Sequence, residues 1–423
     1  MITRKNTKVM QAVACGLALS SNANANTFFE QLEIEPSGRY RYQQVQDQNR
    51  GDASASTLAL RITAAWDNNH QWSGLAQYDH VHGFNRGNFN SVTENIATSP
   101  ISDVPSSELN QFWMQYSSET NWLVKVGRQH LNFDNERHIS SVEFWQNDQT
   151  FDAVLLHYAD GIKWDFNYAY LTKVHRIFSD DAGVILPESD PRFETNPIRP
   201  FSELGNHDHN SHMFNLSYAV NPYVSLTGYA YLLNNSSARQ FSSDTFGMRI
   251  EGQIKPEAIK YGYSAEIAHQ QTSSSSPWDY NGFYFSAEVS AQYKSHEISI
   301  THERLSQDNG LAFVTSLGNN HLFLGWADVF QSYANAQGLT DTFVTYRGRS
   351  GKLRWRALLH QFNSASSGRT IGYEVDLEVA YRYTRDWEFT FIAAMFFTDN
   401  GIDAIPSSQE DLTSLIVSAS YKF

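Results

Sequence analysis

The sequence predicts an all-β fold, a transmembrane antiparallel up-and-down β-barrel of about 18 strands. Apolar and polar side chains alternate in many short segments, a pattern typical of a wall between hydrocarbon and water. Short turns and long loops separate these segments in a regular order. The longest apolar run, residues 391–397, is too short for a membrane-spanning helix, which needs about 20 apolar residues.

The N-terminus has the features of a secretory signal peptide. Basic residues precede a short apolar stretch, and Ala23 and Ala25 fit a cleavage site after residue 25. We therefore expect residues 1–25 to be a cleaved signal peptide and residues 26–423 to form the barrel. A disordered tail and lipidation of Cys15, the single cysteine, remain alternatives. A chain cleaved after residue 25 has no cysteine, so intramolecular disulfides and thiol chemistry are excluded.

Turn signals set the order of the strands. Asp160-Gly161 is a strong hairpin signal, and Pro222 and Pro256 lie where a strand must end because proline cannot donate to a ladder. An even strand number places both chain ends on one side of the membrane. We expect strands at residues 36–46, 57–66, 71–80, 109–117, 122–130, 151–158, 162–171, 212–219, 223–233, 244–253, 259–269, 282–293, 296–305, 342–348, 352–362, 371–383, 387–397 and 412–423.

Side-chain alternation predicts which face of a strand meets lipid. In residues 412–423, Leu415, Val417, Ala419, Tyr421 and Phe423 share one face, and Ser and Lys residues share the other. Residues 371–383 place apolar side chains on one face and three carboxylates in a row on the other. Charges cost several kcal/mol in lipid, so the carboxylates must face water or each other. A soluble β-sandwich is the alternative fold.

Composition limits the partners. The formal net charge of −14 argues against a nucleic-acid surface. The apolar strand faces predict outer-membrane lipid as a partner. The terminal strand, which ends in Phe423, is similar to the signature that outer-membrane barrels present to their assembly machinery. Trp and Tyr near strand ends predict aromatic girdles at the two membrane interfaces.

Three motifs occur in or beside the expected loops. They read GRQHLNFDNER at residues 127–137, WQNDQTFDA at residues 145–153 and HLFLGWAD at residues 321–328. Together they resemble the alginate-export family of outer-membrane porins, and the whole mature chain fits the plan of that family. The resemblance implies an eighteen-stranded barrel in the outer membrane of a Gram-negative cell, which passes the polyuronate alginate through an arginine-rich constriction. It also implies that Arg128 and Arg137, which lie in the first motif, face the pore.

Alternation predicts the side chains that face the lumen. The acids expected at the pore are Glu374, Asp376 and Glu378, and further inward acids oppose the basic side chains. Guanidinium groups bind carboxylates through two oxygens, so a polyanionic sugar would follow the arginine side. Ordinary salt bridges that hold the barrel wall rigid are the alternative role. The basic residues expected at the pore are Arg61, Lys125, Lys163, Arg249, Arg347, Arg354, Arg356 and Arg382.

Residues 321–328 are apolar and aromatic within a long connection, which would be costly to expose to water. We therefore expect this block to fold inward as a constriction loop, with His321, Trp326 and Asp328 at the pore. A rim strand or a short helix at the mouth is the alternative. His207, Asp208, His209 and His212 have metal-ligand side chains, but an exposed polar loop is expected there rather than a metal site.

The predicted function is passage of an anionic oligosaccharide or polysaccharide through the barrel. Alginate-like uronates are the first candidate solute. A general or substrate-specific porin for small organic acids or sugars is the alternative. Ser, His and Asp residues show no nucleophile elbow or other catalytic spacing, so we expect no enzyme. No cofactor is expected, because field and shape in a lumen suffice for selectivity.

Overall fold

The computed structural model describes residues 30–89, 91–93, 98–188, 190, 192–330, 336–399 and 408–423. The expected signal peptide, residues 1–25, lies outside this part of the chain. No helix within the described ranges is long and apolar enough to cross a membrane.

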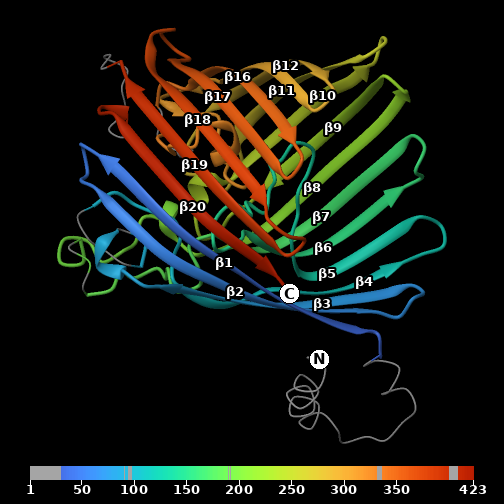
Figure 1. Cartoon of the computed structure of the whole chain (residues 1–423), viewed down its shortest axis with the longest axis horizontal. Helices are drawn as coiled ribbons and strands as arrows, with labels where there is room; N and C mark the ends of the chain where they lie inside the picture. Colours follow the sequence, from blue (N-terminus) through green and yellow to red (C-terminus); the bar gives the residue numbers. More distant parts are fainter. Residues whose placement is uncertain are drawn as a thin grey trace, which may run out of the picture.

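The described chain forms an 18-stranded antiparallel sheet that closes on itself, which confirms the predicted fold class. Each strand pairs with its neighbour in the chain, and the last strand pairs with the first, for example at Ser37 and Lys422. Figure 1 shows the tilted strands side by side in chain order. The strands are β1 (Leu32–Asp47), β2 (Ala53–Asp67), β3 (Trp72–Gly83), β4 (Ser106–Ser117), β5 (Trp122–Gln129), β6 (Thr150–Ala159), β7 (Trp164–His175), β8 (Asn206–Asn221), β9 (Val224–Leu233), β10 (Ser243–Ile254), β11 (Ile259–Thr272), β12 (Asn281–Tyr293), β13 (His296–Leu305), β16 (Leu339–Ser350), β17 (Leu353–Ser364), β18 (Thr370–Arg382), β19 (Trp387–Thr398) and β20 (Leu412–Lys422).

The two ends of the barrel differ in their connections. At one end, here called the turn end, two to four residues join each pair of strands. The other end, here called the loop end, carries the long connections. These include a two-stranded ribbon, β14 (Gln307–Asp308) with β15 (Leu311–Ala312), and a short helix, α3 (Asn320–Phe323). Barrels of the outer membrane place short turns in the periplasm and long loops outside the cell.

The outer face of the wall is apolar, as alternation predicted. In β20, Leu415 and Val417 are exposed, whereas Ser414 and Ser418 are buried on the inner side. Four Trp–Tyr pairs stand directly across from one another near the turn end, with ring centroids 4.4 to 5.0 Å apart. They form an aromatic girdle at one membrane interface. The pairs are Trp72 with Tyr116, Trp122 with Tyr158, Trp164 with Tyr218, and Trp387 with Tyr421.

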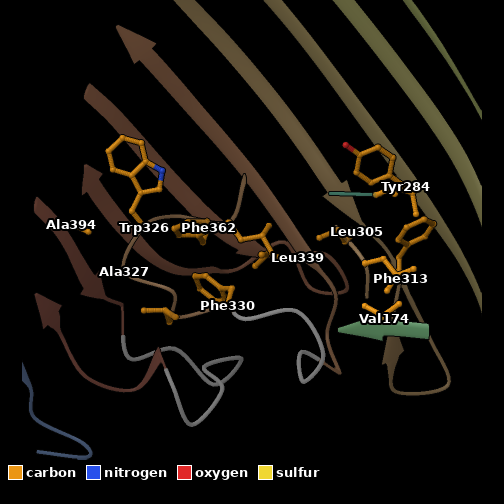
Figure 2. Close-up of a cluster of buried hydrophobic side chains, with 14 of the residues drawn as sticks. Val174, Tyr284, Leu305, Phe313, Trp326, Ala327, Phe330, Leu339, Phe362 and Ala394 are labelled. Atoms are coloured by element: carbon orange, nitrogen blue, oxygen red, sulfur yellow. The ribbon is translucent and has the colours of Figure 1, made fainter. Parts of the chain in front are cut away.

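The apolar core lies inside the barrel, where connections from the loop end pack on the inner wall. Phe330 lies 4.5 Å from the ring of Phe362 on β17 and 5.7 Å from the ring of Phe396 on β19. Figure 2 shows Trp326, Ala327 and Phe330 on one connection that runs along the inner side of these strands. Burying these rings stabilises the inward position of the connection.

Candidate functional site

Two connections fold into the barrel and meet there. The first infolded segment is residues 130–149, between β5 and β6, and the second is residues 313–330, between β13 and β16. Ile139 and Leu317 form a parallel bridge. The amide of Ser140 donates to the carbonyl of Leu317 at 2.9 Å, and the amide of Asn319 donates to the carbonyl of Glu136 at 3.0 Å. The two segments therefore form one partition, and each is also attached to the wall.

The first segment is attached to β1, β2 and β4 by its second half. Arg61 donates to Asp148 at 2.7 Å, and Asn110 donates to the same carboxylate at 3.0 Å. Arg39 donates to the side chain of Gln146 at 2.8 Å and also to the backbone carbonyl of Trp145. Charge-assisted contacts of this kind hold the segment against one side of the wall.

His130 ties the two ends of the first segment together. Its ring nitrogens lie 3.2 Å from Glu143 and 3.2 Å from Asp148. Burial alone would lower the pKa of His130, but these two carboxylates outweigh burial and raise the pKa to about 9. Burial alone would raise the pKa of Asp148, but His130 and Arg61 lower it to about 2. The segment therefore carries a charged His130 between two carboxylates at neutral pH.

The first segment reaches the opposite wall through Arg137 and His138. Arg137 pairs with Glu303 on β13 at 2.6 Å and donates to Thr315 and Asn320 of the second segment. His138 lies 3.0 Å from Glu266 on β11, and that carboxylate also accepts from the hydroxyl of Tyr229 at 2.6 Å. Arg137 is wholly buried. It therefore joins the two segments to the wall. The expectation that Arg137 faces an open pore is wrong.

The second segment is held against β17 and β18. The amide of Ala327 donates to Glu374 at 2.8 Å, and the indole of Trp326 lies 4.3 Å from the guanidinium of Arg356. Gly325 has a φ of +83°, and a Cβ there would lie 2.6 Å from the Glu374 carboxylate. Glycine is therefore required at this close approach. Figure 2 shows Trp326 and Ala327 on this connection.

His321 connects the second segment to the first. Its ring stacks on Phe144 with centroids 3.7 Å apart, and its Nδ1 lies 3.0 Å from Asp328. His321, Trp326 and Asp328 all lie inside the barrel, although part of the block forms the short helix α3. The structure thus combines inward folding with the short helix that was expected only as an alternative.

Acids of the inner wall gather beneath the second segment. Glu374 and Asp376 on β18 are 1% and 0% exposed, and they contact each other. His360 on β17 lies 2.8 Å from Asp341 and 3.5 Å from Asp376. The structure therefore covers Glu374 and Asp376, which were expected to line the pore, because the second segment packs over them.

An arginine ladder crosses the inner wall between this cluster and the turn end. Arg347 and Arg356 are directly opposite across β16 and β17. Arg347 pairs with Glu297 at 2.9 Å, and Arg356 pairs with Glu378 at 3.0 Å. Closer to the turn end, Glu388 lies 2.7 Å from Arg354 and 3.7 Å from Arg382. We call Arg347, Arg354, Arg356 and Arg382 the arginine ladder.

Three members of the ladder are accessible. The side chains of Arg347, Arg354 and Arg382 are 45%, 46% and 59% exposed, whereas Arg356 lies under Trp326. Small residues continue the row from Arg354 to Arg41 on β1, because the register places Ala380, Thr390 and Ser418 between them. Ala380, Ser418 and Arg41 are themselves buried, so the row is most accessible at its Arg354 end.

The other expected basic residues have varied positions. Arg128 pairs directly across with Phe112, which is 60% exposed on the outer face, so Arg128 lies on that face with its partner Asp152 and does not line the lumen. Lys163 lies in a connection at the turn end. Lys125 lies over the ring of Trp113, and Arg249 pairs with Glu251 and Glu266.

Sequence reasoning missed two arginines on β1. Arg39 reaches the first infolded segment, and Arg41 pairs with Asp103 at 3.1 Å. The alternation of Arg39 and Arg41 with Tyr40 and Tyr42 was a sufficient signal, because the tyrosines are exposed on the outer face.

The histidines expected in a polar loop belong to β8 instead. Residues 206–211 add to the sheet, so His207 and His209 are buried on the inner face while Asp208 is exposed. Alternation therefore separates Asp208 from the two histidines, which share the inner face with ring centroids 6.4 Å apart. Among the residues that the structure describes, no three His, Cys, Asp or Glu side chains form a group that could hold a metal ion.

Comparisons with known proteins agree with this geometry. The family model described as alginate export matches residues 30–299, which is more than half of the chain. The crystal structure of Pseudomonas aeruginosa OccK9 (OpdG) superimposes with a TM-score of 0.67 at 11% identity, covering 94% of this chain and 99% of that chain. Acinetobacter baumannii OccAB2 gives 0.66 at 11% identity, with coverage of 94% and 99%. Pseudomonas aeruginosa OccK11 (OpdR) gives 0.63 at 11% identity, with coverage of 94% and 97%. No curated protein matches the sequence.

Proposed function

Since the chain belongs to the alginate-export family and folds as an outer-membrane porin barrel, we propose that it passes an anionic oligosaccharide or polysaccharide, with alginate-like uronates first. The family and the fold place the barrel in the outer membrane of a Gram-negative cell. The family and the fold are both found in transport proteins. Selectivity in such a barrel comes from the electric field and the shape of the lumen.

The arginine ladder carries the proposal. Arg347, Arg354 and Arg382 are each about half exposed inside the lumen. Ion pairs this exposed are worth only about 0–1 kcal/mol. A carboxylate of a passing sugar can therefore replace Glu297 or Glu388 as the partner of a guanidinium group at little cost. Arginine suits this exchange because its planar donors match a carboxylate in two positions.

The two infolded segments supply the shape. They are joined to each other and attached to β1, β2, β4, β11, β13 and β18. A solute that enters from the loop end must pass beside them to reach the ladder. A chain of linked sugars can enter this space end-on. Its successive carboxylates can then move from one arginine of the ladder to the next.

The C-terminal strand supports a proposed partner in assembly. Phe423 is 75% exposed beyond the end of β20. Its ring packs edge-on against Tyr421 with centroids 4.4 Å apart, and its amide donates to the carbonyl of Pro36 at 3.1 Å, so β20 presents an ordered and exposed aromatic ring. We assign the barrel-assembly machinery as the partner of this strand, and membrane lipid as the partner of the apolar outer face.

Conductance across a planar bilayer tests the proposed function. Purified full-length protein should give anion-selective conductance that oligouronates block. Neutral oligosaccharides of the same length are the matched control, and they should block much less. Equal block by the neutral and anionic chains would contradict the proposal. Because a passive pore follows the gradient, the measurement is independent of whether the cell uses it for export or uptake.

A porin for small organic acids or sugars is the second candidate. The attachment of the infolded segments to several sides of the wall favours it, because a narrowed lumen suits small solutes. The same bilayers discriminate the two functions. Block by single carboxylated solutes, with indifference to oligouronates, would support the second candidate. Lipid hydrolysis without conductance would instead indicate an enzyme.

A further inference from the structure

Two buried carboxyl groups, here called the carboxyl pair, lie in contact under the second infolded segment. They belong to Glu374 and Asp376, which are two residues apart on the inner face of β18. The residues directly across on β19 are Phe396 and Ala394, which are also buried and have no polar atom in their side chains. The carboxyl pair therefore lies between an apolar part of the wall and the second segment.

The backbone of Gly325, Trp326 and Ala327, here called the cover, lies directly on the carboxyl pair. The amide of Ala327 donates to one oxygen of Glu374 at 2.8 Å, and the amide of Trp326 donates to Asp376. A Cβ on Gly325 would lie 2.6 Å from both oxygens of Glu374. Figure 2 shows Trp326 and Ala327 on this connection. The cover thus keeps water away from both carboxyl groups.

The contact within the carboxyl pair requires a proton. The second oxygen of Glu374 is buried and has no hydrogen-bond donor among the described residues, and its neighbour is the carboxyl group of Asp376. Two ionised carboxylates can only accept hydrogen bonds, so they bond to each other only when one of them carries a proton. Two like charges in contact without water also repel each other. One proton shared by the two groups removes both problems.

His360 on β17 contacts the carboxyl pair, but a second acid competes for it. The ring lies 2.8 Å from Asp341 on β16 and 3.5 Å from Asp376. Directly across from Asp341, on β13, is Glu303, whose partner is Arg137. One imidazole therefore faces two acids on this side, and it cannot balance a second negative charge on the carboxyl pair.

The other charged groups beside the carboxyl pair have partners of their own. His321 and Asp328 of the second segment lie 3.0 Å apart. Arg356 on β17 pairs with Glu378 on β18 at 3.0 Å. In the part of the chain that the structure describes, no lysine or arginine forms an ion pair with either member of the carboxyl pair. Charge balance therefore also favours a shared proton.

We propose that Glu374 and Asp376 share a proton which keeps the cover in place, and that the cover leaves them when a rise in pH removes this proton. The proton passes to water in the lumen, and two adjacent carboxylates remain. Water reaches them when the cover moves, because the cover encloses them against the wall. The same movement takes Trp326 off the guanidinium of Arg356, which lies 4.3 Å from the indole. The lumen widens, and the arginine ladder gains an accessible guanidinium.

The inference rests on the proposed function, because it gives the arginine ladder a control by pH. Conductance of the full-length protein in a planar bilayer tests it. We expect the single-channel conductance to rise about twofold or more between about pH 5 and about pH 8, since buried carboxyl groups ionise in this range and a wider lumen conducts better. This range lies below the pKa of about 9 at which His130 of the first segment loses its charge.

Glu374→Gln is the decisive variant. Its amide can donate to Asp376 as the shared proton does, and pH does not remove it, so the variant should keep the low conductance throughout the range. Glu288→Gln makes the same change at an inner-wall acid of β12 that accepts from Thr301, and it should behave as the wild type does. A wild-type conductance that is constant with pH, or the same rise in Glu374→Gln, would overturn the inference.

Gly325→Ala should have the opposite effect. The new Cβ would lie 2.6 Å from the Glu374 carboxylate, so the cover cannot take its observed position. The variant should therefore show, at the acidic end of the range, the high conductance that the wild type reaches at the alkaline end. A low conductance of Gly325→Ala at the acidic end would contradict the role of the cover.

Thiol labelling follows the cover without a conductance measurement. Cys15 is the single cysteine of the chain, so Cys15→Ser with Ala327→Cys leaves one thiol, at a position that is 7% exposed. Its modification by a water-soluble methanethiosulfonate should accelerate with pH about tenfold more than in the same protein with Glu374→Gln, which shares the ordinary ionisation of the thiol. Equal acceleration in the two proteins would overturn the inference.

Selectivity separates this inference from the proposed function. Arg356→Ala should lower the anion selectivity more at the alkaline end of the range, where Trp326 no longer covers Arg356, than at the acidic end. An equal effect at both ends would overturn the link between the cover and the ladder. Anion selectivity without a rise of conductance with pH would reject the inference alone. A rise that Glu374→Gln abolishes, in a channel without anion selectivity, would reject the proposed function alone.

Discussion

Arg137 and Glu303 meet at 2.6 Å with both side chains buried, and this pair joins the first infolded segment to β13. The same guanidinium donates to Thr315 and Asn320 of the second segment, at 3.0 Å and 2.9 Å. One side chain thus connects three parts of the barrel that are far apart in the sequence.

Arg137→Met should destabilise the barrel by about 3–5 kcal/mol, because it leaves the buried Glu303 carboxylate without its charged partner and with the hydroxyl of Tyr284 as its remaining donor, at 2.8 Å. Urea-induced unfolding of the barrel from lipid vesicles measures the change in the free energy of unfolding. Arg347→Met is the matched control, since its half-exposed pair with Glu297 is worth only about 0–1 kcal/mol. The double variant Arg137→Met with Glu303→Gln should recover part of the loss. Equal effects of the two single Met variants would show that Arg137 is not a structural link.

Arg354→Ala and Arg356→Ala should both reduce anion preference, with the larger effect at Arg354. The reason is access, because Arg354 is 46% exposed whereas Trp326 covers Arg356. Reversal potentials under a salt gradient measure the preference. Arg239→Ala, which removes the same charge from a connection at the loop end, serves as the control. Selectivity that does not change in either ladder variant would remove the ladder from the mechanism.

The position of the first infolded segment should depend on pH through His130 and Asp148. The pKa of His130 is raised from 6.5 to about 9. The stability that charged His130 contributes to the folded protein is therefore fully present below pH 6.5 and is lost as pH rises through about 9. The pKa of Asp148 is lowered from 3.8 to about 2, so its stabilisation is full above pH 3.8 and is lost as pH falls through about 2.

Single-channel recordings from pH 6 to pH 10 test this dependence. We expect current fluctuations to increase as pH approaches about 9, since the segment loses its charged His130. His130→Ala should show those fluctuations already at neutral pH, and should respond less to a further rise. A wild-type current that is steady across the whole interval would contradict the predicted role of His130.

Glu374→Gln should stabilise the barrel by about 1 kcal/mol or leave its stability unchanged. The amide oxygen can still accept from Ala327, while the amide nitrogen takes the place of a buried Glu374 oxygen that has no hydrogen-bond partner. It can then donate to Asp376, which Glu374 already contacts. Glu374→Ala removes the contact to Ala327 and should destabilise. The comparison uses the same unfolding assay, and a Gln variant as unstable as the Ala variant would contradict the argument.

Local patterns were sufficient to predict the barrel. Alternation in residues 371–383 identified Tyr373 and Leu377 as outer and Glu374 and Asp376 as inner, and the structure has them so. Alternation depends only on neighbours in the chain and on the solvent at each face. The aromatic girdle follows in the same way, because Trp72 and Trp122 lie where strands begin after short turns.

The interior could not be predicted in the same way, because its contacts are not local. Alternation says that Glu374 points inward, but it cannot say that Ala327 will lie on it. Arg137 was expected at the pore because of its motif, and its burial depends on Glu303 and on the second segment. Arg128 was misplaced for a simpler reason. It has the parity of Val126, which is exposed on the outer face, so alternation predicts the outer face where the motif predicts the pore, and the structure follows alternation.

The reversal potential of the wild-type channel under a salt gradient, measured with and without oligouronates, tests the central claim most directly. We expect a reversal potential of the sign that an anion-selective pore gives, together with a current that oligouronates block. A potential of the sign set by cations, with a current that oligouronates leave unchanged, would contradict the claim that the exposed arginines guide the solute.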